Sequence, residues 1–220
     1  MAAVRRVAAL LLVCSMQCLA APFAVQVGEA RLALDAPPGF ADTTNMGSPR
    51  LQELSESLTS ASNRVLLFAL SDGDIRRFTL GDQLELRRYM AVFTARAAER
   101  ERMTEGAFKS MAADLQRELG SLPSGDYLKH LEAQAPGAVS ILAELRRDPD
   151  AIAVLQGTRA KGRTFFEKST YYLSSTSLVL LRGKAVTLSV STQYDQPADL
   201  EWIRTVTARW IDELKRLNNR

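Results

Sequence analysis

The C-terminal part of the sequence constrains the fold most, because it places a long amphipathic stretch directly after an alternating strand. From Val186 to Ser191 every second side chain is apolar, which is typical of a strand with one buried face. Residues 199–217 then carry apolar side chains at helical spacing. The members of this stripe are Ile203, Val206, Trp210, Leu214 and Leu217. Because both apolar surfaces must leave water, we expect this helix to pack on a sheet.

Six further segments have the composition of strands, and turn signals separate them. They are residues 25–34, 65–70, 86–94, 152–155, 164–173 and 178–181. The sequence Pro37-Pro38-Gly39-Phe40 ends the first strand, and Ser71-Asp72-Gly73-Asp74 ends the second. Residues 174–177, which are Ser and Thr, predict a turn between the last two strands, and Arg182-Gly183 predicts a tight hairpin after them. The continuous apolar run at 65–70 indicates a strand covered on both faces.

Helical spacing marks the regions between these strands. A helix begins at Ser48-Pro49, since Ser caps helices and Pro suits the first helical position. A second helix is expected at 104–119, and two shorter ones at 127–131 and 139–145. The sequence therefore predicts one α+β domain with a helical insertion at 104–147.

The first twenty residues have the pattern of a secretory signal peptide. Arg5 and Arg6 form a basic start, and residues 7–13 are an uninterrupted apolar run. We expect cleavage between Ala20 and Ala21, so that the mature domain is 21–220 and its location is the periplasm. The apolar run is well short of the roughly 20 residues that a transmembrane helix needs, so no membrane span is expected.

Both cysteines of the chain, Cys14 and Cys18, lie in this leader. A lipoprotein is the alternative interpretation, but Val13 and Gln17 stand where a lipidation signal requires a small residue. The mature chain then contains no cysteine, and it can be stable in an oxidising compartment without a disulfide.

Charge excludes one class of partner. The chain has 28 basic and 25 acidic residues, and removal of Arg5 and Arg6 leaves 26 basic residues against 25 acidic ones. A nucleic-acid-binding protein depends on a basic excess, so we expect no nucleic-acid partner. The single histidine, His130, gives a zinc site or a histidine-based catalytic triad no second imidazole, and we expect no metal or other cofactor.

The two ends of the domain together resemble a known family. A strand leads into Pro37-Pro38-Gly39-Phe40, and an antiparallel meander at 171–190 precedes a closing helix that carries Trp202 and Trp210. This arrangement resembles the PsbP-like α/β/α sandwich. The resemblance covers about 70 residues in two blocks. It implies a central antiparallel sheet flanked by helices, and an accessory or binding role without a shared catalytic centre. No functional residue can be carried over from the family.

Acidic and basic residues gather at the ends of the expected elements. The acidic ones are Asp72, Asp74, Asp148, Asp150, Asp195 and Asp199. Paired carboxylates can act as glycosidase catalysts or bind hard metals, and the alternative is ordinary turns. Three arginine pairs, Arg76-Arg77, Arg87-Arg88 and Arg146-Arg147, could bind an anion or simply lie at solvated edges.

Four residues form the candidate ligand or partner surface. Arg88 lies in an otherwise apolar strand, so its guanidinium must reach either solvent or a buried acid. Tyr171, Tyr172 and Trp202 could add an aromatic binding face, and the alternative is that they pack the sheet against a helix.

Two hypotheses about function follow from the sequence. The first is an exported, periplasmic, non-catalytic binding or accessory protein whose partner is an envelope protein or a small ligand. The second is a carboxylate-based hydrolase or sugar-binding enzyme. A cleft with two facing acids near Asp72 and Asp195 would favour the second hypothesis.

Overall fold

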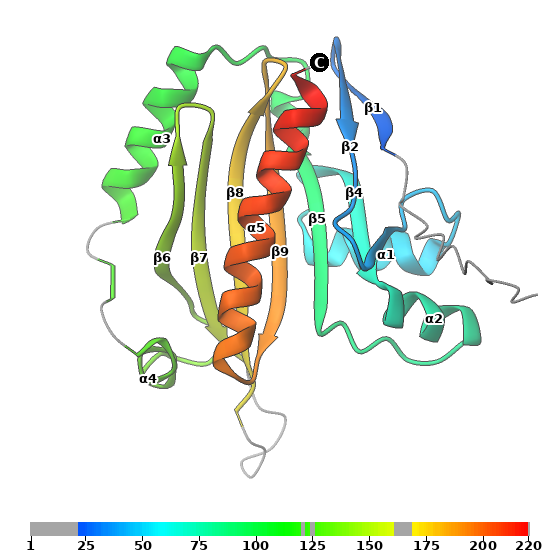
Figure 1. Ribbon diagram of the computed structural model, residues 1–220, viewed down its shortest axis with the longest axis vertical. Coiled ribbons are helices and arrows are strands. Elements are labelled where there is room, and N and C mark those ends of the chain that lie inside the picture. The colour runs from blue at the N-terminus through cyan, green and yellow to red at the C-terminus, as the bar shows by residue number, and fades with distance from the viewer. Residues whose placement is uncertain (1–21, 120–121, 124–125, 161–168, 220) are drawn as a thin grey trace, which may run out of the picture.

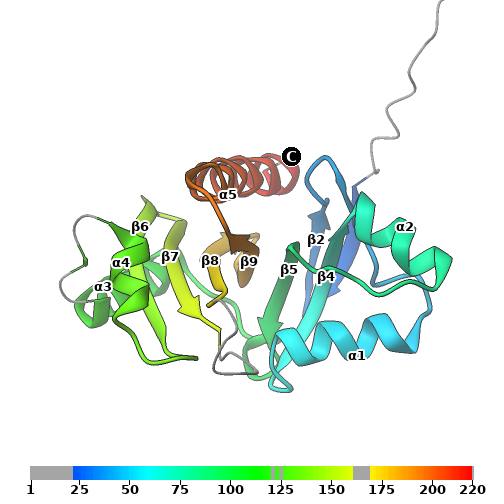
Figure 2. The same ribbon diagram turned by 90° about the horizontal axis from the view of Figure 1, so that it is seen from below.

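A seven-stranded antiparallel sheet crosses the protein, with helices on both of its faces (Figure 1, Figure 2). The computed structural model describes residues 22–119, 122–123, 126–160 and 169–219. Neighbouring strands follow the order β3-β4-β5-β9-β8-β7-β6, and β1 pairs with β2 in a separate hairpin. This arrangement confirms the α+β fold class and the sheet flanked by helices. The expected signal peptide and its cleavage site at Ala20 and Ala21 lie outside the described residues.

The described residues form nine strands and five α-helices. The strands are β1 (Phe23–Val27), β2 (Ala30–Leu34), β3 (Phe40–Asp42), β4 (Asn63–Ser71), β5 (Arg88–Ala95), β6 (Val139–Asp148), β7 (Ala151–Arg159), β8 (Tyr171–Leu181) and β9 (Lys184–Tyr194). The helices are α1 (Pro49–Leu58), α2 (Asp72–Leu80), α3 (Glu105–Leu119), α4 (Tyr127–Glu132) and α5 (Pro197–Asn218).

Strand β4 is covered on both faces, as its continuous apolar run predicts. Leu67 and Ala69 belong to the core beneath α5, whereas Phe68 and Leu70 belong to a second core beneath α1 and α2. Figure 2 shows the resulting layers, with α5 on one side of the sheet and α1 on the other. Two apolar cores therefore hold the sheet between helices.

Helix α5 lies along β8 and β9 and also contacts β2. The ring N–H of Trp210 donates to the carbonyl oxygen of Asp35 at 2.8 Å. Near the C-terminus, the Asn218 amide bonds both the N–H and the C=O of Ala33, at 2.9 and 2.8 Å. The packing of this helix on the sheet is confirmed, and the helix also holds the β1–β2 hairpin in place.

The tight hairpin at Arg182-Gly183 is confirmed. Both residues have positive φ, 49° and 76°, as a two-residue type I′ turn requires. The expected strand at 25–34 is instead a second hairpin, which turns at Gly28 with φ of 56°. A Cβ at Gly28 would lie 2.5 Å from the carbonyl oxygen of Glu99, so this turn leaves no room for a side chain.

The helix expected at 139–145 is wrong, because these residues begin the edge strand β6. The register of β6 against β7 shifts at Leu142 and again at Leu145. Each bulge inserts one residue, so apolar side chains recur locally every three residues instead of every two. That spacing imitates a helix. Of the helical insertion expected at 104–147, α3 and the short α4 are observed.

The turn expected at residues 174–177 is also wrong, because β8 runs unbroken through them. Ser175 is fully buried, and its hydroxyl hydrogen-bonds that of Thr207 on α5 at 2.6 Å. Ser175 therefore lies under α5, where its small side chain allows close approach, and the buried Ser177 shares its face of β8. Of the strand expected at 164–173, residues 164–168 lie outside the described part of the chain.

The expected turn at residues 71–74 is instead the start of helix α2. Ser71 caps this helix by accepting the N–H of Asp74 at 3.1 Å, and Gly81 ends it in the left-handed conformation. The buried Asp74 carboxylate accepts the N–H of Glu85 at 2.8 Å. The Ser-x-x-Asp spacing followed by Ile75 is a capping signal that could have identified the helix.

Candidate functional site

Arg88 reaches a buried acid, which is one of the two outcomes that its sequence position allows. Its Nη2 donates to Oδ1 of Asp199 at 2.8 Å. The guanidinium also lies 4.1 Å from the ring centre of Trp202, and that ring lies 6.1 Å from the ring of Phe40. Arg88 and Trp202 are therefore neighbours at the N-terminal end of α5, held by a cation–π contact and an ion pair.

The carboxylate of Asp199 is nearly fully buried, with 2% of the residue exposed. It accepts the backbone N–H groups of Asp195 and Gln196 at 3.1 and 3.2 Å. Burial alone raises its pKa, but the hydrogen bond from Arg88 and the two backbone bonds outweigh burial and hold the pKa of Asp199 below its usual value. This cluster fastens the start of α5 to β5, so its role is structural.

The two tyrosines of the candidate surface lie on opposite faces of β8. Tyr171 is half-buried, pairs with Tyr194 across β8 and β9, and packs against the core beneath α5. Tyr172 points to the other face and is 42% exposed. The structure therefore brings Arg88 and Trp202 together but does not gather all four residues on one surface.

A cavity of about 260 Å³ lies between β6 and α5 (the β6–α5 cavity). Strand β6 contributes Glu144, Leu145 and Arg146, and α5 contributes Arg204, Thr207 and Ile211. The second bulge of β6 falls at Leu145, within this lining. Bulges often occur at sheet edges and beside binding sites, because they redirect side chains.

Arg146 is one of two arginines in this cavity, and its charge is fully used within the protein. It forms ion pairs with Asp148 and with Asp212, the latter at 2.7 Å. Burial lowers the pKa of Arg146, but the hydrogen bonds with these two acids outweigh that effect and raise it. Glu144 is likewise paired with Arg147. These two arginines thus face three carboxylates, and Lys215 adds a third cation that pairs with Asp148 and Asp150.

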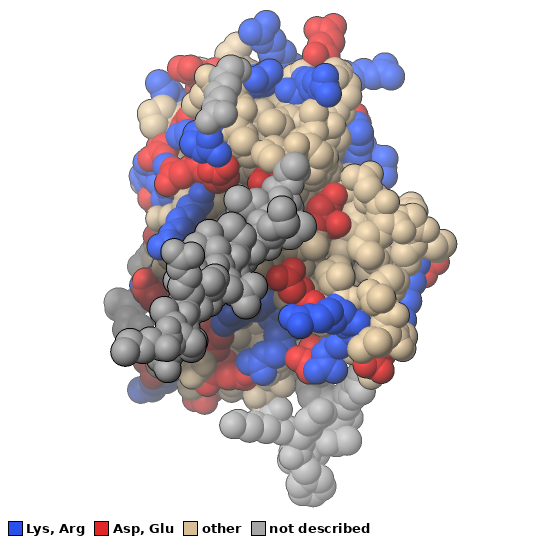
Figure 3. All heavy atoms as spheres, turned by 45° about the vertical axis from the view of Figure 1, so that its right-hand side comes forward, with Lys and Arg blue, Asp and Glu red and all other residues tan. Residues whose placement is uncertain are grey.

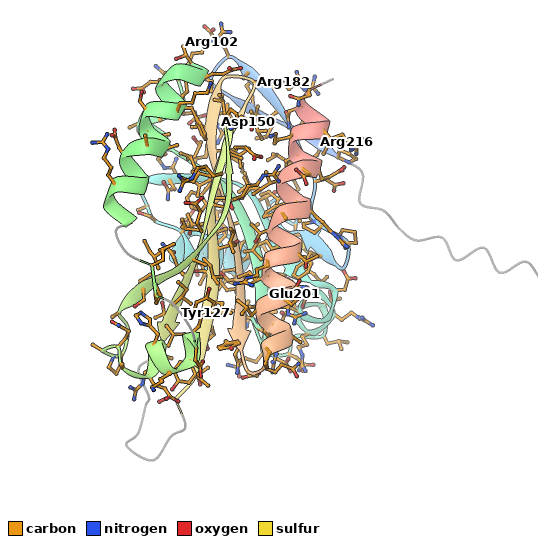
Figure 4. The ribbon with its side chains drawn as sticks, turned by 60° about the vertical axis from the view of Figure 1, so that its left-hand side comes forward. Arg102, Tyr127, Asp150, Arg182, Glu201 and Arg216 are labelled. Atoms are coloured by element: carbon orange, nitrogen blue, oxygen red, sulfur yellow. The ribbon has the colours of Figure 1, made fainter. Side chains whose placement is uncertain are left out.

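Arg204 is the second arginine of the cavity, and it differs from Arg146. Its Nη2 donates to the hydroxyl of Tyr127 at 3.4 Å, and its Nε is buried without an acceptor among the described residues. Figure 4 shows Tyr127 on α4, at the same end of the sheet as Glu201 of α5. The cavity thus contains a guanidinium whose hydrogen-bonding capacity is only partly used.

A second cavity, of about 380 Å³, lies beneath α1. Among the described residues, no buried polar side-chain atom of its lining lacks a hydrogen-bond partner. The hydroxyl of Thr43 donates to the carbonyl of Phe68 at 2.8 Å, and Arg64 forms an ion pair with Glu99. This cavity therefore offers a ligand no unused buried donor, unlike the β6–α5 cavity.

The expected acidic residues do not gather in either cavity. Asp72 and Asp195 line neither of them, and Asp195 forms an ion pair with Arg87. His130 lies half-buried on α4. In the part of the chain that the structure describes, no group of three or more potential metal ligands is found. No helix there is long and apolar enough to cross a membrane.

The sequence singled out Arg146 but not Arg204. Arg146 belongs to one of the arginine pairs that could bind an anion. Arg204 directly follows Ile203 of the apolar stripe, a position that normally carries a solvated charge at the edge of an amphipathic helix. No pattern in the sequence indicates that β6 folds back beside it, so no signal could have identified it.

Comparison with solved structures finds a distant likeness in fold. No protein-family model matches the chain, and no curated protein matches it. The crystal structure of the Ran-binding protein Mog1p from Saccharomyces cerevisiae aligns with 90% of this chain and 94% of its own, at 13% identity and a TM-score of 0.39. A likeness at this level carries no argument about either fold or function. The observed class is an α+β protein with an antiparallel sheet between helices, and the PsbP-like resemblance stays a prediction.

Proposed function

We propose that the chain is an exported, non-catalytic binding protein of the periplasm, and that a small ligand occupies the β6–α5 cavity. The leader at residues 1–20 supports export. The observation that carries the binding proposal is Arg204, whose buried Nε has no acceptor among the described residues although it borders a cavity. Buried donors are normally paired, so the incompletely used guanidinium of Arg204, which lines the cavity, supports a ligand-binding role.

The charges around the cavity support binding rather than catalysis. A general acid or base must exchange a proton, whereas Glu144, Asp148 and Asp212 are each engaged in an ion pair with an arginine. One face of the molecule also supports a partner other than nucleic acid. On the face drawn in Figure 3, basic and acidic side chains are interspersed and do not form a continuous basic patch.

Expression of the whole precursor tests both parts of the proposal. Intact mass spectrometry of protein purified from the envelope fraction should give the mass of a chain that starts at Ala21. Native mass spectrometry of the same sample should show an additional small mass that is lost on denaturation. A start elsewhere by more than a few residues, or a lipid mass on Cys14 or Cys18, would contradict soluble export.

A pair of variants places the ligand. Ala208 is an exposed residue of α5 that lines the cavity, so Ala208→Phe should fill the space and abolish the additional mass. Ala198→Phe is the matched control, because Ala198 is an exposed alanine of the same helix away from the cavity. Retention of the ligand by Ala208→Phe, or its equal loss from both variants, would overturn the assignment of the cavity.

A further inference from the structure

The cavity beneath α1 (the α1 cavity) contains two side chains of opposite charge that have no ion-pair partner among the described residues. It lies on the face of the sheet that α1 covers, opposite α5 (Figure 2). The charged side chains of its lining are Arg64, Arg96 and Glu56. Arg64 forms an ion pair with Glu99. The charges that remain to meet a ligand are therefore one cation, Arg96, and one anion, Glu56.

Arg96 is held in place by its inner atoms, and the end of its guanidinium is left unused. Its backbone N–H donates to the carbonyl of Ser62 at 2.9 Å, and its Nε donates to the carbonyl of Ala61 at 3.3 Å. Among the described residues, neither of its Nη groups has an acceptor, and the residue is exposed. Two Nη groups can donate in parallel to both oxygens of a carboxylate, so Arg96 is suited to bind one.

Glu56 has the complementary property. Its Oε1 accepts the side-chain N–H of Gln52, one turn earlier on α1, at 3.0 Å. No lysine or arginine of the described residues pairs with this carboxylate, and the residue is exposed. A carboxylate can accept several hydrogen bonds, so Glu56 keeps acceptor capacity for an ammonium group.

The two charges select a ligand that carries both signs. Arg96 and Glu56 line one cavity, but no ion pair joins them, since neutral neighbours tether each of them separately. A simple anion on Arg96 would be repelled by Glu56, and a simple cation on Glu56 would be repelled by Arg96. A ligand with a carboxylate and an ammonium group is attracted by both residues.

The size and the other walls of the cavity fit a small polar molecule. Its volume of about 380 Å³ lies within the range of roughly 300–1,000 Å³ that is usual for ligand pockets. The half-buried Val65 supplies apolar surface for a short carbon chain. Asn63 pairs with Ala95 in the register of β4 and β5, and it therefore lies beside Arg96. Its side-chain amide has no partner among the described residues and adds a second donor for the carboxylate.

We infer that the α1 cavity binds a small zwitterion, with its carboxylate on Arg96 and its ammonium group on Glu56. This site goes beyond the proposed function, because it lies on the other face of the sheet and does not depend on the β6–α5 cavity. Both ion pairs form at exposed side chains, so the affinity is expected to be millimolar. A ligand that binds this weakly is lost on purification and does not contribute to a co-purified mass.

NMR titration of the mature protein tests the class of ligand. Glycine, γ-aminobutyrate and 5-aminopentanoate carry the same two charges at increasing separation. At least one of them should bind at millimolar concentration and shift the backbone signals of Gln52, Asn63 and Arg96. The simple carboxylate and the simple amine of the same chain length should each bind about 5- to 10-fold more weakly, because one charge-assisted contact is lost. Equal binding of either simple compound, shifts confined to other residues, or no binding of any zwitterion overturns the inference.

Variants assign each charge of the ligand to its residue. Arg96→Gln should bind the zwitterion no better than the simple amine, and Glu56→Gln should bind it no better than the simple carboxylate. Arg100→Gln and Glu53→Gln are the matched controls, because Arg100 and Glu53 are exposed and lie outside the lining of the cavity. Full discrimination in Arg96→Gln or Glu56→Gln, or equal loss in the controls, overturns the inference.

Two further measurements separate this site from folding and from the β6–α5 cavity. Arg96 and Glu56 are exposed, so both variants should unfold within about 3 °C of the parent. Lost binding together with a larger fall in unfolding temperature in both variants would show a structural role and overturn the inference. Ala208→Phe fills the other cavity and should keep zwitterion binding. Loss of zwitterion binding in Ala208→Phe would place the zwitterion in the β6–α5 cavity, so that the proposed function stands and the present inference fails.

Discussion

Polar residues of the same type have distinct roles in and around α5, although the sequence presents them alike. Asp199 is buried with three hydrogen bonds from its neighbours, while the exposed Asp195 pairs with Arg87 at the surface. Ser175 has a buried partner in Thr207, whereas the buried hydroxyl of Ser177 has no partner among the described residues. Each contrast provides a prediction in which one residue acts as the control for its neighbour.

Asp199→Asn should destabilise the protein by about 1–2 kcal/mol at neutral pH, because a buried charge-assisted bond to Arg88 is weakened. The folded pKa of Asp199 lies below its ordinary value of 3.8. Its carboxylate therefore stabilises the fold fully above that ordinary value, and this contribution is lost as the pH falls toward the lowered folded pKa.

Urea titrations of the parent and the Asp199→Asn variant between pH 7 and pH 3 would measure this dependence. The difference in unfolding free energy should be constant down to about pH 5 and shrink below about pH 4. Burial raises the pKa of Asp35. Because Asp35 titrates in both proteins, its contribution cancels in the difference between their unfolding free energies. Asp195→Asn should change stability by less than about 1 kcal/mol, since both partners of its ion pair are exposed. A difference that grows in acid would contradict the assignment.

Ser177→Ala should leave the free energy of unfolding unchanged or raise it by up to about 1 kcal/mol, because an unpaired buried hydroxyl is removed. Ser175→Ala should lower it by about 1–2 kcal/mol, because Thr207 loses its partner. Chemical denaturation at equal m-values compares the two. The reverse order would contradict the different roles of the two hydroxyls.

Local sequence signals predict some secondary-structure elements correctly, whereas pairing with distant strands decides others. Helices α1 and α5 begin and run where caps and apolar spacing predict. Strand β6 does not follow its local pattern, because pairing with β7 and two bulges override it. Helix α5 is the most informative element to test, because it packs on β8 and β9 of the sheet and also contacts β2 of the β1–β2 hairpin.

Trp210→Ala should lower the free energy of unfolding by about 3–5 kcal/mol, as expected for a large core aromatic. Trp210 is 3% exposed, and its ring also bonds to the carbonyl of Asp35. Trp202→Ala should cost about 1–2 kcal/mol, because Trp202 is only half-buried and mainly supports Arg88. Urea titrations of both variants decide this. A Trp210→Ala variant as stable as its parent would show that α5 does not pack on the sheet.

For the molecule as a whole, two apolar cores and the antiparallel sheet hold the fold together. The proposed cleavage before Ala21 would remove both cysteines of the chain. The described residues also hold no cluster of three or more metal ligands. Stability should therefore depend on packing and hydrogen bonding within the domain.

We therefore expect the melting temperature of the mature protein to be the same with and without a chelator or a reductant. Differential scanning calorimetry on one preparation, divided between the conditions, measures it. A fall of more than about 5 °C on adding chelator, which corresponds to roughly 2 kcal/mol for a domain of this size, would reveal a structural metal ion.

The sequence by itself determined the features that depend on near neighbours. The helix start at Ser48-Pro49, the hairpin at Arg182-Gly183 and the stripe of α5 follow from caps, turn preferences and spacing within a few residues. Only the tertiary structure decided which strands pair, that β6 is a bulged edge strand, and that Arg204 borders a cavity. These depend on contacts between distant segments, such as β6 beside α5, and no local pattern encodes such contacts.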